Sequence, residues 1–279
     1  MKKVSLFTAF LFILFCIISI PGTGFTQTED EHSNEESSSV APRIDLGCDF
    51  VSRYIWRGKD YGNSPSIQPN FSFSAAGFKI GAWGSYGISD YKIKINDTIT
   101  VEMGHYAEAD LFISYTYKWF TIGVTDYFFP NPLNPNYGNK YFNYKNETTG
   151  HTLEACISFN GTDKVPLQIY AGTFFYGADK GKDSTGTYGA GDKNNFSTYL
   201  EASYLFTIKK IDVGLKPFIG GIPFGSAWYG DSAGIVNLGL TASRSFKITK
   251  GFSLPVYASL ITNPQAQSIF FVFGITLSP

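Results

Sequence analysis

Residues that support catalysis are few in this chain, and their spacing fits none of the common catalytic arrangements. Beyond residue 42 the only histidines are His105 and His151, and neither stands at a fixed spacing from a serine and an acid. The run 179–183 lacks the carboxylate density of a calcium loop, and no Cys/His pair has a zinc-binding spacing. The sequence therefore predicts no catalytic residue, no metal site and no cofactor.

Charged side chains recur instead at alternate positions of apolar segments. In the first segment Ile44, Leu46 and Phe50 share one face, while Asp45 and Asp49 share the other. Such alternation is typical of a strand with one apolar and one wet face. Extended along the chain, the pattern predicts wet-face residues lining an interior, which are Asp45, Asp49, Arg53, Arg57, Lys79, Trp83, Glu108, Asp110, Glu154, Glu201 and Lys216.

Twelve segments of this kind follow one another beyond residue 42. They cover 44–57, 66–75, 78–86, 106–117, 120–128, 150–159, 166–176, 195–207, 212–219, 234–245, 252–261 and 268–277. Most are longer than the usual strand of a globular protein and match the roughly 9–11 residues that cross a bilayer at a tilt. The fold class predicted is all-β, an antiparallel up-and-down transmembrane barrel of about twelve strands.

The connections between these segments alternate between short and long. Short ones stand at 76–77, 118–119, 160–165, 208–211 and 246–251, whereas 87–105, 129–149 and 177–194 are long. Short periplasmic turns and long extracellular loops are the arrangement of outer-membrane barrels. Aromatic residues gather near both ends of the segments, which favours two belts at the membrane interfaces. The outer belt includes Tyr54, Trp56, Tyr127 and Tyr199, and the belt near the short turns includes Phe78, Tyr115, Tyr117, Phe120 and Tyr204.

The first 42 residues differ from the rest. Lys2 and Lys3 precede an apolar run, which predicts a signal peptide over 1–26 and export to the cell outer membrane, with a retained membrane anchor as the alternative. Residues 27–42 form a polar, acidic stretch that predicts a disordered periplasmic leader. The barrel is expected over 43–279.

The charge of the barrel region is nearly balanced. Residues 1–40 hold five acids and two bases, so 22 − 2 = 20 bases face 23 − 5 = 18 acids in the remainder. This small excess of bases excludes a nucleic-acid partner.

Four stretches carry a resemblance to a known family. They are Ser52-Arg53-Tyr54-Ile55-Trp56-Arg57-Gly58, Ser66-Ile67-Gln68-Pro69 and Gly77-Phe78-Lys79-Ile80-Gly81-Ala82-Trp83-Gly84-Ser85, followed later by Asp126-Tyr127-Phe128-Phe129-Pro130. Together they resemble the TorF family of bacterial outer-membrane porins. The resemblance implies an outer-membrane barrel with a pore role and no assigned substrate.

The function expected is a channel for passive diffusion of small polar solutes or ions, since both charge signs line the interior. Arg53 and Arg57 are expected either to pair with carboxylates such as Asp49 or to contact solute. Pro130, Pro132 and Pro135 stiffen a loop that either constricts the lumen or stays at the surface. The alternatives are a plugged structural barrel, a surface-binding barrel and, last, an outer-membrane hydrolase. Expected partners are outer-membrane lipid, small solutes and the barrel-insertion machinery, and the oligomeric state stays open.

Overall fold

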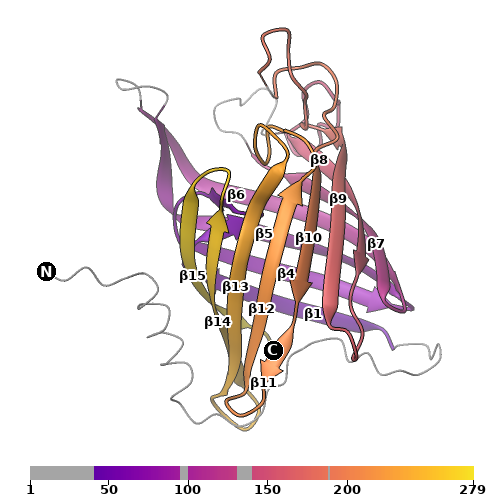
Figure 1. Ribbon diagram of the computed structural model, residues 1–279, viewed down its shortest axis with the longest axis vertical. Coiled ribbons are helices and arrows are strands. Elements are labelled where there is room, and N and C mark those ends of the chain that lie inside the picture. Colours follow the sequence, from indigo (N-terminus) through magenta and orange to yellow (C-terminus); the bar gives the residue numbers. More distant parts are fainter. Residues whose placement is uncertain (1–40, 95–99, 131–139, 188) are drawn as a thin grey trace, which may run out of the picture.

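The wall of the protein is one antiparallel sheet closed on itself. The computed structural model describes residues 41–94, 100–130, 140–187 and 189–279 (Figure 1). The wall strands are β1 (Arg43–Val51), β4 (Ser66–Ala75), β5 (Phe78–Lys94), β6 (Thr100–Tyr117), β7 (Phe120–Phe128), β8 (His151–Phe159), β9 (Leu167–Gly177), β10 (Thr198–Tyr204), β11 (Phe206–Ile208), β12 (Val213–Ile222), β13 (Gly234–Lys247), β14 (Ser253–Asn263) and β15 (Ser268–Leu277). β10 and β11 pair with successive parts of β12 and act as one wall strand, so the thirteen segments make the predicted twelve-strand barrel. Among the described residues, no helix is long and apolar enough to cross a membrane.

Each wall strand presents an apolar face outward and a more polar face inward. On β6 the side chains of Leu111 and Ile113 are 47% and 49% exposed, whereas the adjacent Asp110 is 6% exposed. Ile80 on β5 and Ile122 on β7 continue the same outward surface. An apolar surface that surrounds a whole barrel is far larger than a soluble monomer exposes, and it matches the lipid-facing band of a membrane barrel.

Turn geometry separates the two ends of the barrel. At one end β4 and β5 are joined by Ala76 and Gly77, whose positive φ angles of 50° and 82° suit a tight two-residue hairpin turn. We call this the short-turn end and the opposite end the long-loop end. The predicted long loop 87–105 is wrong in its bounds, because β5 runs to Lys94 and β6 starts at Thr100. Polar and apolar residues keep alternating along these two strands, and β5 and β6 stay paired beyond the ends of the neighbouring wall strands.

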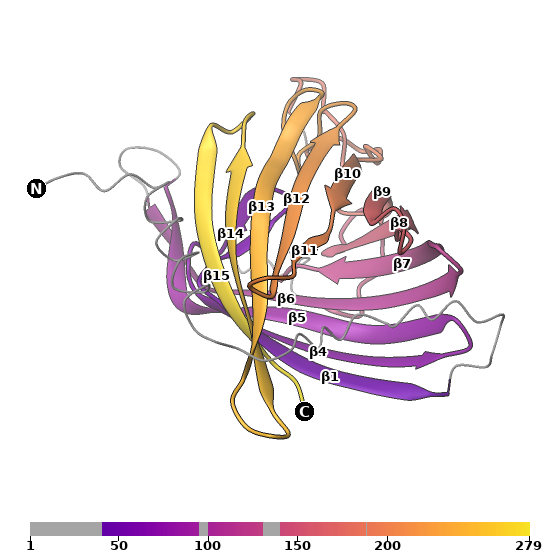
Figure 2. The same ribbon diagram turned by 60° about the horizontal axis from the view of Figure 1, so that its bottom comes forward.

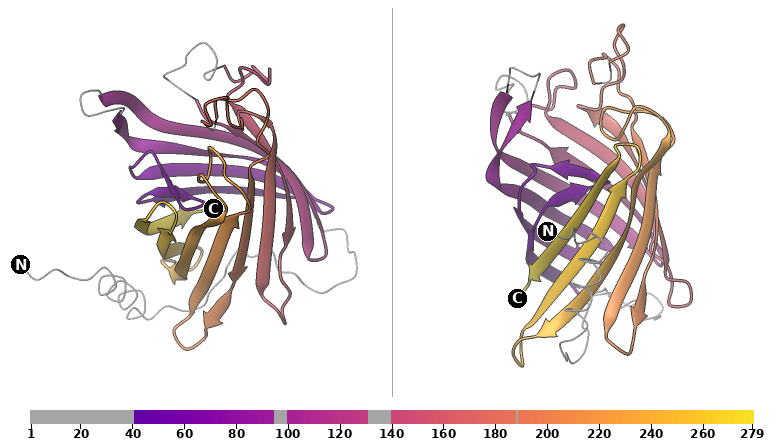
Figure 3. Two further views of the ribbon diagram at one scale, coloured as in Figure 1. Left: turned by 45° about the horizontal axis from the view of Figure 1, so that its top comes forward. Right: turned by 60° about the vertical axis from the view of Figure 1, so that its left-hand side comes forward.

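A second, small sheet lies inside the barrel. The prediction of a first strand running to Arg57 is wrong, because β1 ends at Val51 and the chain then leaves the wall. It forms the two short strands β2 (Tyr54–Trp56) and β3 (Lys59–Tyr61), paired antiparallel. Figure 3 shows this indigo segment within the ring of wall strands. We call residues 52–65 the lumen hairpin.

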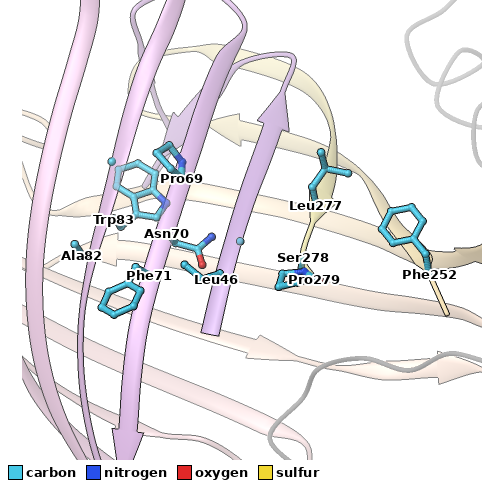
Figure 4. Close-up of a pocket in the computed structure, with 12 residues that line it drawn as sticks. Leu46, Pro69, Asn70, Phe71, Ala82, Trp83, Phe252, Leu277, Ser278 and Pro279 are labelled. Atoms are coloured by element: carbon cyan, nitrogen blue, oxygen red, sulfur yellow. The ribbon is translucent and has the colours of Figure 1, made fainter. Parts of the chain in front are cut away.

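The seam between the first and last strands is incomplete. β1 pairs with β15 at four positions, from Cys48 to Val51, but with β4 at nine. Figure 2 shows β1 diverging from β13 and β14 toward the short-turn end. A hollow of about 900 Å³ borders this gap, and Figure 4 shows Leu277 and Pro279 on one side of it and Leu46 and Phe71 on the other.

Candidate lumen site

The lumen hairpin crosses the interior from one wall to the opposite one. Aromatic residues favour its short strands, and its tip is Arg57 and Gly58, with φ angles of 50° and 78°. Gly58 touches β13, where a Cβ atom would come within 1.9 Å of the Val236 carbonyl oxygen. The Asn263 side-chain amide donates to the Gly58 carbonyl at 3.3 Å. The tip therefore fits against β13 only as glycine.

Arg57 joins the hairpin to β8 and β9. Its Nη1 and Nη2 atoms donate to Glu154 Oε1 and Oε2 at 2.7 and 2.8 Å. Nη2 also donates to the Tyr170 hydroxyl at 2.9 Å, and Nη1 to the Tyr229 hydroxyl. Counted around the wall from β1, strands β8 to β10 take the sixth to eighth of the twelve places and so lie opposite β1. The ion pair thus bridges the full width of the barrel.

The bidentate pair is buried and further satisfied. The side chains of Arg57 and Glu154 are 8% and 1% exposed. Tyr127 and Tyr170 donate to Glu154 Oε2 at 2.9 and 2.7 Å. Burial acts to lower the pKa of the Arg57 guanidinium, but Tyr229 and Glu154 outweigh burial and raise that pKa well above its ordinary value. Arg57 is therefore a permanent cation held by a carboxylate.

Aromatic rings fill the space around this pair. Arg57 lies 4.4 Å from the centroid of the Trp56 ring and 4.6 Å from that of Tyr199, within cation–π range. The buried cluster consists of Tyr127, Phe174, Tyr199, Ile222, Tyr229 and Val236, with Trp56, Phe129, Tyr170 and Trp228 packed against it. The cluster lies inside the barrel toward the long-loop end.

These rings correct part of the prediction of an outer aromatic belt, whose members Tyr86 and Phe175 are exposed. Tyr54, Trp56, Tyr127 and Tyr199 belong to that predicted belt, yet all four lie inside the barrel. Trp56 packs on Tyr127, and both Trp56 and Tyr199 are within cation–π range of Arg57. Tyr54 packs on Trp83. Alternation alone does not separate a ring that faces lipid from one that faces a filled lumen. At the short-turn end the rings of the predicted belt are exposed, among them Phe78, Tyr115, Tyr117, Phe120 and Tyr204.

Two inward carboxylates on β6 lie under the hairpin. Glu108 and Asp110 are 5% and 6% exposed. The Tyr106 hydroxyl donates to Glu108 Oε2 at 2.7 Å. Tyr54 of the hairpin packs on the Tyr106 ring at 5.9 Å and on that of Trp83 at 5.4 Å. The hairpin therefore covers this acidic pair from the lumen side.

The other charged residues of the predicted lining are spread over the wall and the hairpin. Arg53 does not pair with Asp49; it pairs with Asp60 of the hairpin at 2.8 Å, because the chain has left the wall there. Asp49 accepts from the Thr276 hydroxyl at 2.6 Å, and Asp45 pairs with Arg43 at 2.9 Å. Lys79 on β5 is half-buried.

A small polar cavity lies in the interior on the short-turn side of the Arg57 network. Its volume is about 250 Å³, and Glu201, Lys216, Tyr170, Ser203 and Gln168 are among the residues that line it. Because a water takes about 30 Å³ of liquid volume, the cavity has room for several waters. Tyr170 lines the cavity on the side of the Arg57 network, because its hydroxyl bonds to both Arg57 and Glu154.

The loop after β7 contributes to the rim of the barrel. Phe129 stacks on Tyr61 of the hairpin at a centroid distance of 6.3 Å. Pro130 follows it at partial burial, while Pro132 and Pro135 lie outside the described residues, so the constriction stays a prediction.

His151 is fully buried, with Nδ1 2.8 Å from Asp126 Oδ1 and Nε2 bonded to the Tyr141 carbonyl. Both ring nitrogens are thus engaged by groups other than a serine.

Among the described residues, no three His, Cys, Asp or Glu side chains gather where they could hold a metal ion.

The fold and its filled polar interior define a membrane-spanning β-barrel protein of the outer-membrane type. The bacterial family Gcw_chp, described as of unknown function, matches residues 35–222, and the chain belongs to this family. No curated protein matches the chain. The TorF name is not among these findings.

Several solved structures are similar to the chain at low identity. One, titled "Unveiling the Mechanism Behind the in-meso Crystallization of Membrane Proteins", has 7% identity and a TM-score of 0.39, with 84% of this chain and 83% of that chain covered. Salmonella typhi OmpF in complex with daunomycin has 9% identity and a TM-score of 0.34, with 87% and 100% covered. A mutant porin of Rh. blastica has 9% identity and a TM-score of 0.32, with 85% and 100% covered.

Proposed function

We propose that the protein is an outer-membrane channel for passive diffusion of small polar solutes or ions, and that the lumen hairpin closes its outer half. The observation that carries the proposal is the polar cavity of about 250 Å³ inside a wall whose outer face is apolar. A barrel built only as a scaffold has no need of a hydrated interior, whereas a channel requires one. Lys216 and Glu201 give this cavity both charge signs, which suits small polar solutes.

The remaining parts of the proposal concern the envelope. The short-turn end faces the periplasm, as short turns do in such barrels, so the hairpin closes the side toward the exterior. Residues 1–26 serve as the signal peptide and 27–42 as a periplasmic leader. The resemblance to the TorF porins supports the same location and role. The barrel-insertion machinery assembles the protein into outer-membrane lipid.

The strand register allows a direct test by removing the hairpin. Val51 of β1 pairs with Ser66 of β4, so residues 52–65 can be replaced by Asn-Gly, which forms a two-residue turn between paired positions. All nine β1–β4 pairs are kept. In planar bilayers this variant should conduct steadily and more strongly than the wild type, because the bridge across the lumen is gone.

A matched control shortens an exposed loop that does not enter the lumen. Residues 183–187 form a turn in which Asp183 and Thr187 bond to each other. Replacing this turn with Gly-Gly should leave conductance at the wild-type level. Equal conductance of the hairpin-less variant and the wild type would contradict the proposed closure.

The second candidate is a permanently plugged barrel with a structural role. The extensive contacts of Arg57, whose side chain is 8% exposed, favour it. It predicts no current from the wild type, even after folding is verified by the heat-dependent electrophoretic mobility of the barrel, and current only after the hairpin is deleted. Current through the wild-type protein, with a solute-size limit, decides between the two.

A further inference from the structure

Two acids of the lumen have an arginine partner. Glu154 pairs with Arg57, and Asp60 pairs with Arg53. Glu108 and Asp110 differ, since no ion pair joins either of them to a lysine or arginine within the described part of the chain. Both are more than nine-tenths buried. Two acidic side chains therefore share one region of the lumen without a cation from the protein.

The strand register shows why no basic residue reaches them. On β5, Ser85 stands beside Glu108 and Trp83 beside Asp110. On β7, Tyr127 stands beside Asp110. Neutral side chains thus flank the pair on both neighbouring strands.

One oxygen of each carboxylate has no hydrogen-bond donor. Glu108 Oε2 accepts from Tyr106, but Glu108 Oε1 and Asp110 Oδ1 are buried and accept no hydrogen bond from the described residues. Their positions at i and i+2 of one strand put both side chains on the same face. The two carboxylates with an unsatisfied oxygen therefore lie on the same inward face of β6, under the hairpin.

We propose that Glu108 and Asp110 bind a hard, oxygen-preferring cation of the sodium, potassium or calcium type. Burying an uncompensated carboxylate is costly, so a counter-ion that enters the lumen is attracted strongly to this pair. Carboxylate oxygens suit such ions, and waters complete the coordination. Two carboxylates make a weak site, and weak binding lets a permeating ion leave again. This inference rests on the proposed function only for the route by which the ion arrives.

Terbium luminescence provides the binding test, because Tb³⁺ takes oxygen ligands and the Tyr54, Tyr106 and Trp83 rings near the pair can sensitise it. The full-length protein, folded in detergent, is titrated with TbCl₃ and then with CaCl₂ as competitor. The wild type should show one saturable sensitised site that calcium displaces. Glu108→Gln and Asp110→Asn should each weaken Tb³⁺ binding by about tenfold or more, since each removes one of two attracting charges.

Glu147→Gln is the matched control, because Glu147 is an exposed loop residue and loses the same charge. It should bind Tb³⁺ as the wild type does. If one lumen substitution prevents folding, the other carries the comparison. Absence of a saturable site in the wild type, or a site unchanged in both lumen variants, overturns the proposal; a proton shared between the two carboxyl groups gives the first of these results.

Conductance separates this inference from the proposed function. Terbium binding without any channel current in either the wild type or the hairpin-less variant leaves the cation site intact and rejects the channel. Current without a Tb³⁺ site rejects the cation site alone. When both hold, the reversal potential of the hairpin-less variant in a KCl gradient should show cation preference, and Glu108→Gln should reduce it.

Discussion

Replacing Arg57 with alanine is expected to open the lumen, because it leaves Glu154 buried without a cation. The guanidinium makes two short bonds to Glu154, at 2.7 and 2.8 Å, and two more to the Tyr170 and Tyr229 hydroxyls. Removing one partner of a buried ion pair costs about 3–5 kcal/mol. This cost destabilises the closed state, in which Glu154 is buried. It does not affect the open state, because water solvates Glu154 once the hairpin has left the lumen.

The expected change in population follows from this energy. Each 1.4 kcal/mol is a factor of ten, so the ratio of open to closed hairpin should rise by about two to three and a half orders of magnitude. Arg53→Ala removes the same charge from the same hairpin. Because the Arg53 side chain is 37% exposed, its pair with Asp60 contributes only about 0–1 kcal/mol, and the ratio should change by less than about fivefold.

Single-channel recording in planar bilayers measures this ratio as open probability. Arg57→Ala should show long open periods, while Arg53→Ala should resemble the wild type. Indistinguishable open probabilities of the two variants would refute the assignment of Arg57 as the anchor. A double variant, Arg57→Met with Glu154→Met, removes both charges and should therefore stay more closed than Arg57→Ala.

Gly58→Ala should loosen the hairpin tip, because its Cβ atom would stand 1.9 Å from the Val236 carbonyl oxygen at a φ of 78°; the variant should raise open probability, and wild-type gating would show that the tip is not seated on β13. Ile113→Arg should impair insertion into lipid vesicles by about 2–4 kcal/mol, the cost of a charge on the lipid face, since Ile113 is 49% exposed on the outer wall. Ser114→Arg, one residue further along and half-buried on the other face, should insert far better; equal insertion of the two would mean that the faces are misassigned.

The wall could be predicted from the sequence because each strand repeats a simple rule. Alternating polarity with period two places Leu111 and Ile113 outside and Asp110 inside, and the short turns set which strands pair. Hairpin pairing between neighbours is local in sequence, so it needs no knowledge of distant contacts. The twelve expected segments correspond to the twelve wall strands for this reason.

The lumen hairpin could not be predicted by the same rule. The alternation of β1 continues through Arg53 to Arg57, so a longer strand satisfied the pattern. A signal was nevertheless present: Arg57-Gly58 stands between two short β-prone runs, Tyr54-Ile55-Trp56 and Lys59-Asp60-Tyr61, as a two-residue turn does. What no local pattern contains is the partner of Arg57, because Glu154 is 97 residues away.

The chemistry of the closure also suggests that it is reversible. A plug made only of aliphatic side chains would lose apolar burial on opening with nothing regained from water. Here the centre of the contact is Arg57 with Glu154, surrounded by tyrosine hydroxyls. Burying such a pair gives little net stability, because desolvation offsets the attraction, and both groups regain hydration when water enters the lumen. The ion pair therefore fixes where the hairpin docks, while its polarity keeps the free energy of undocking small.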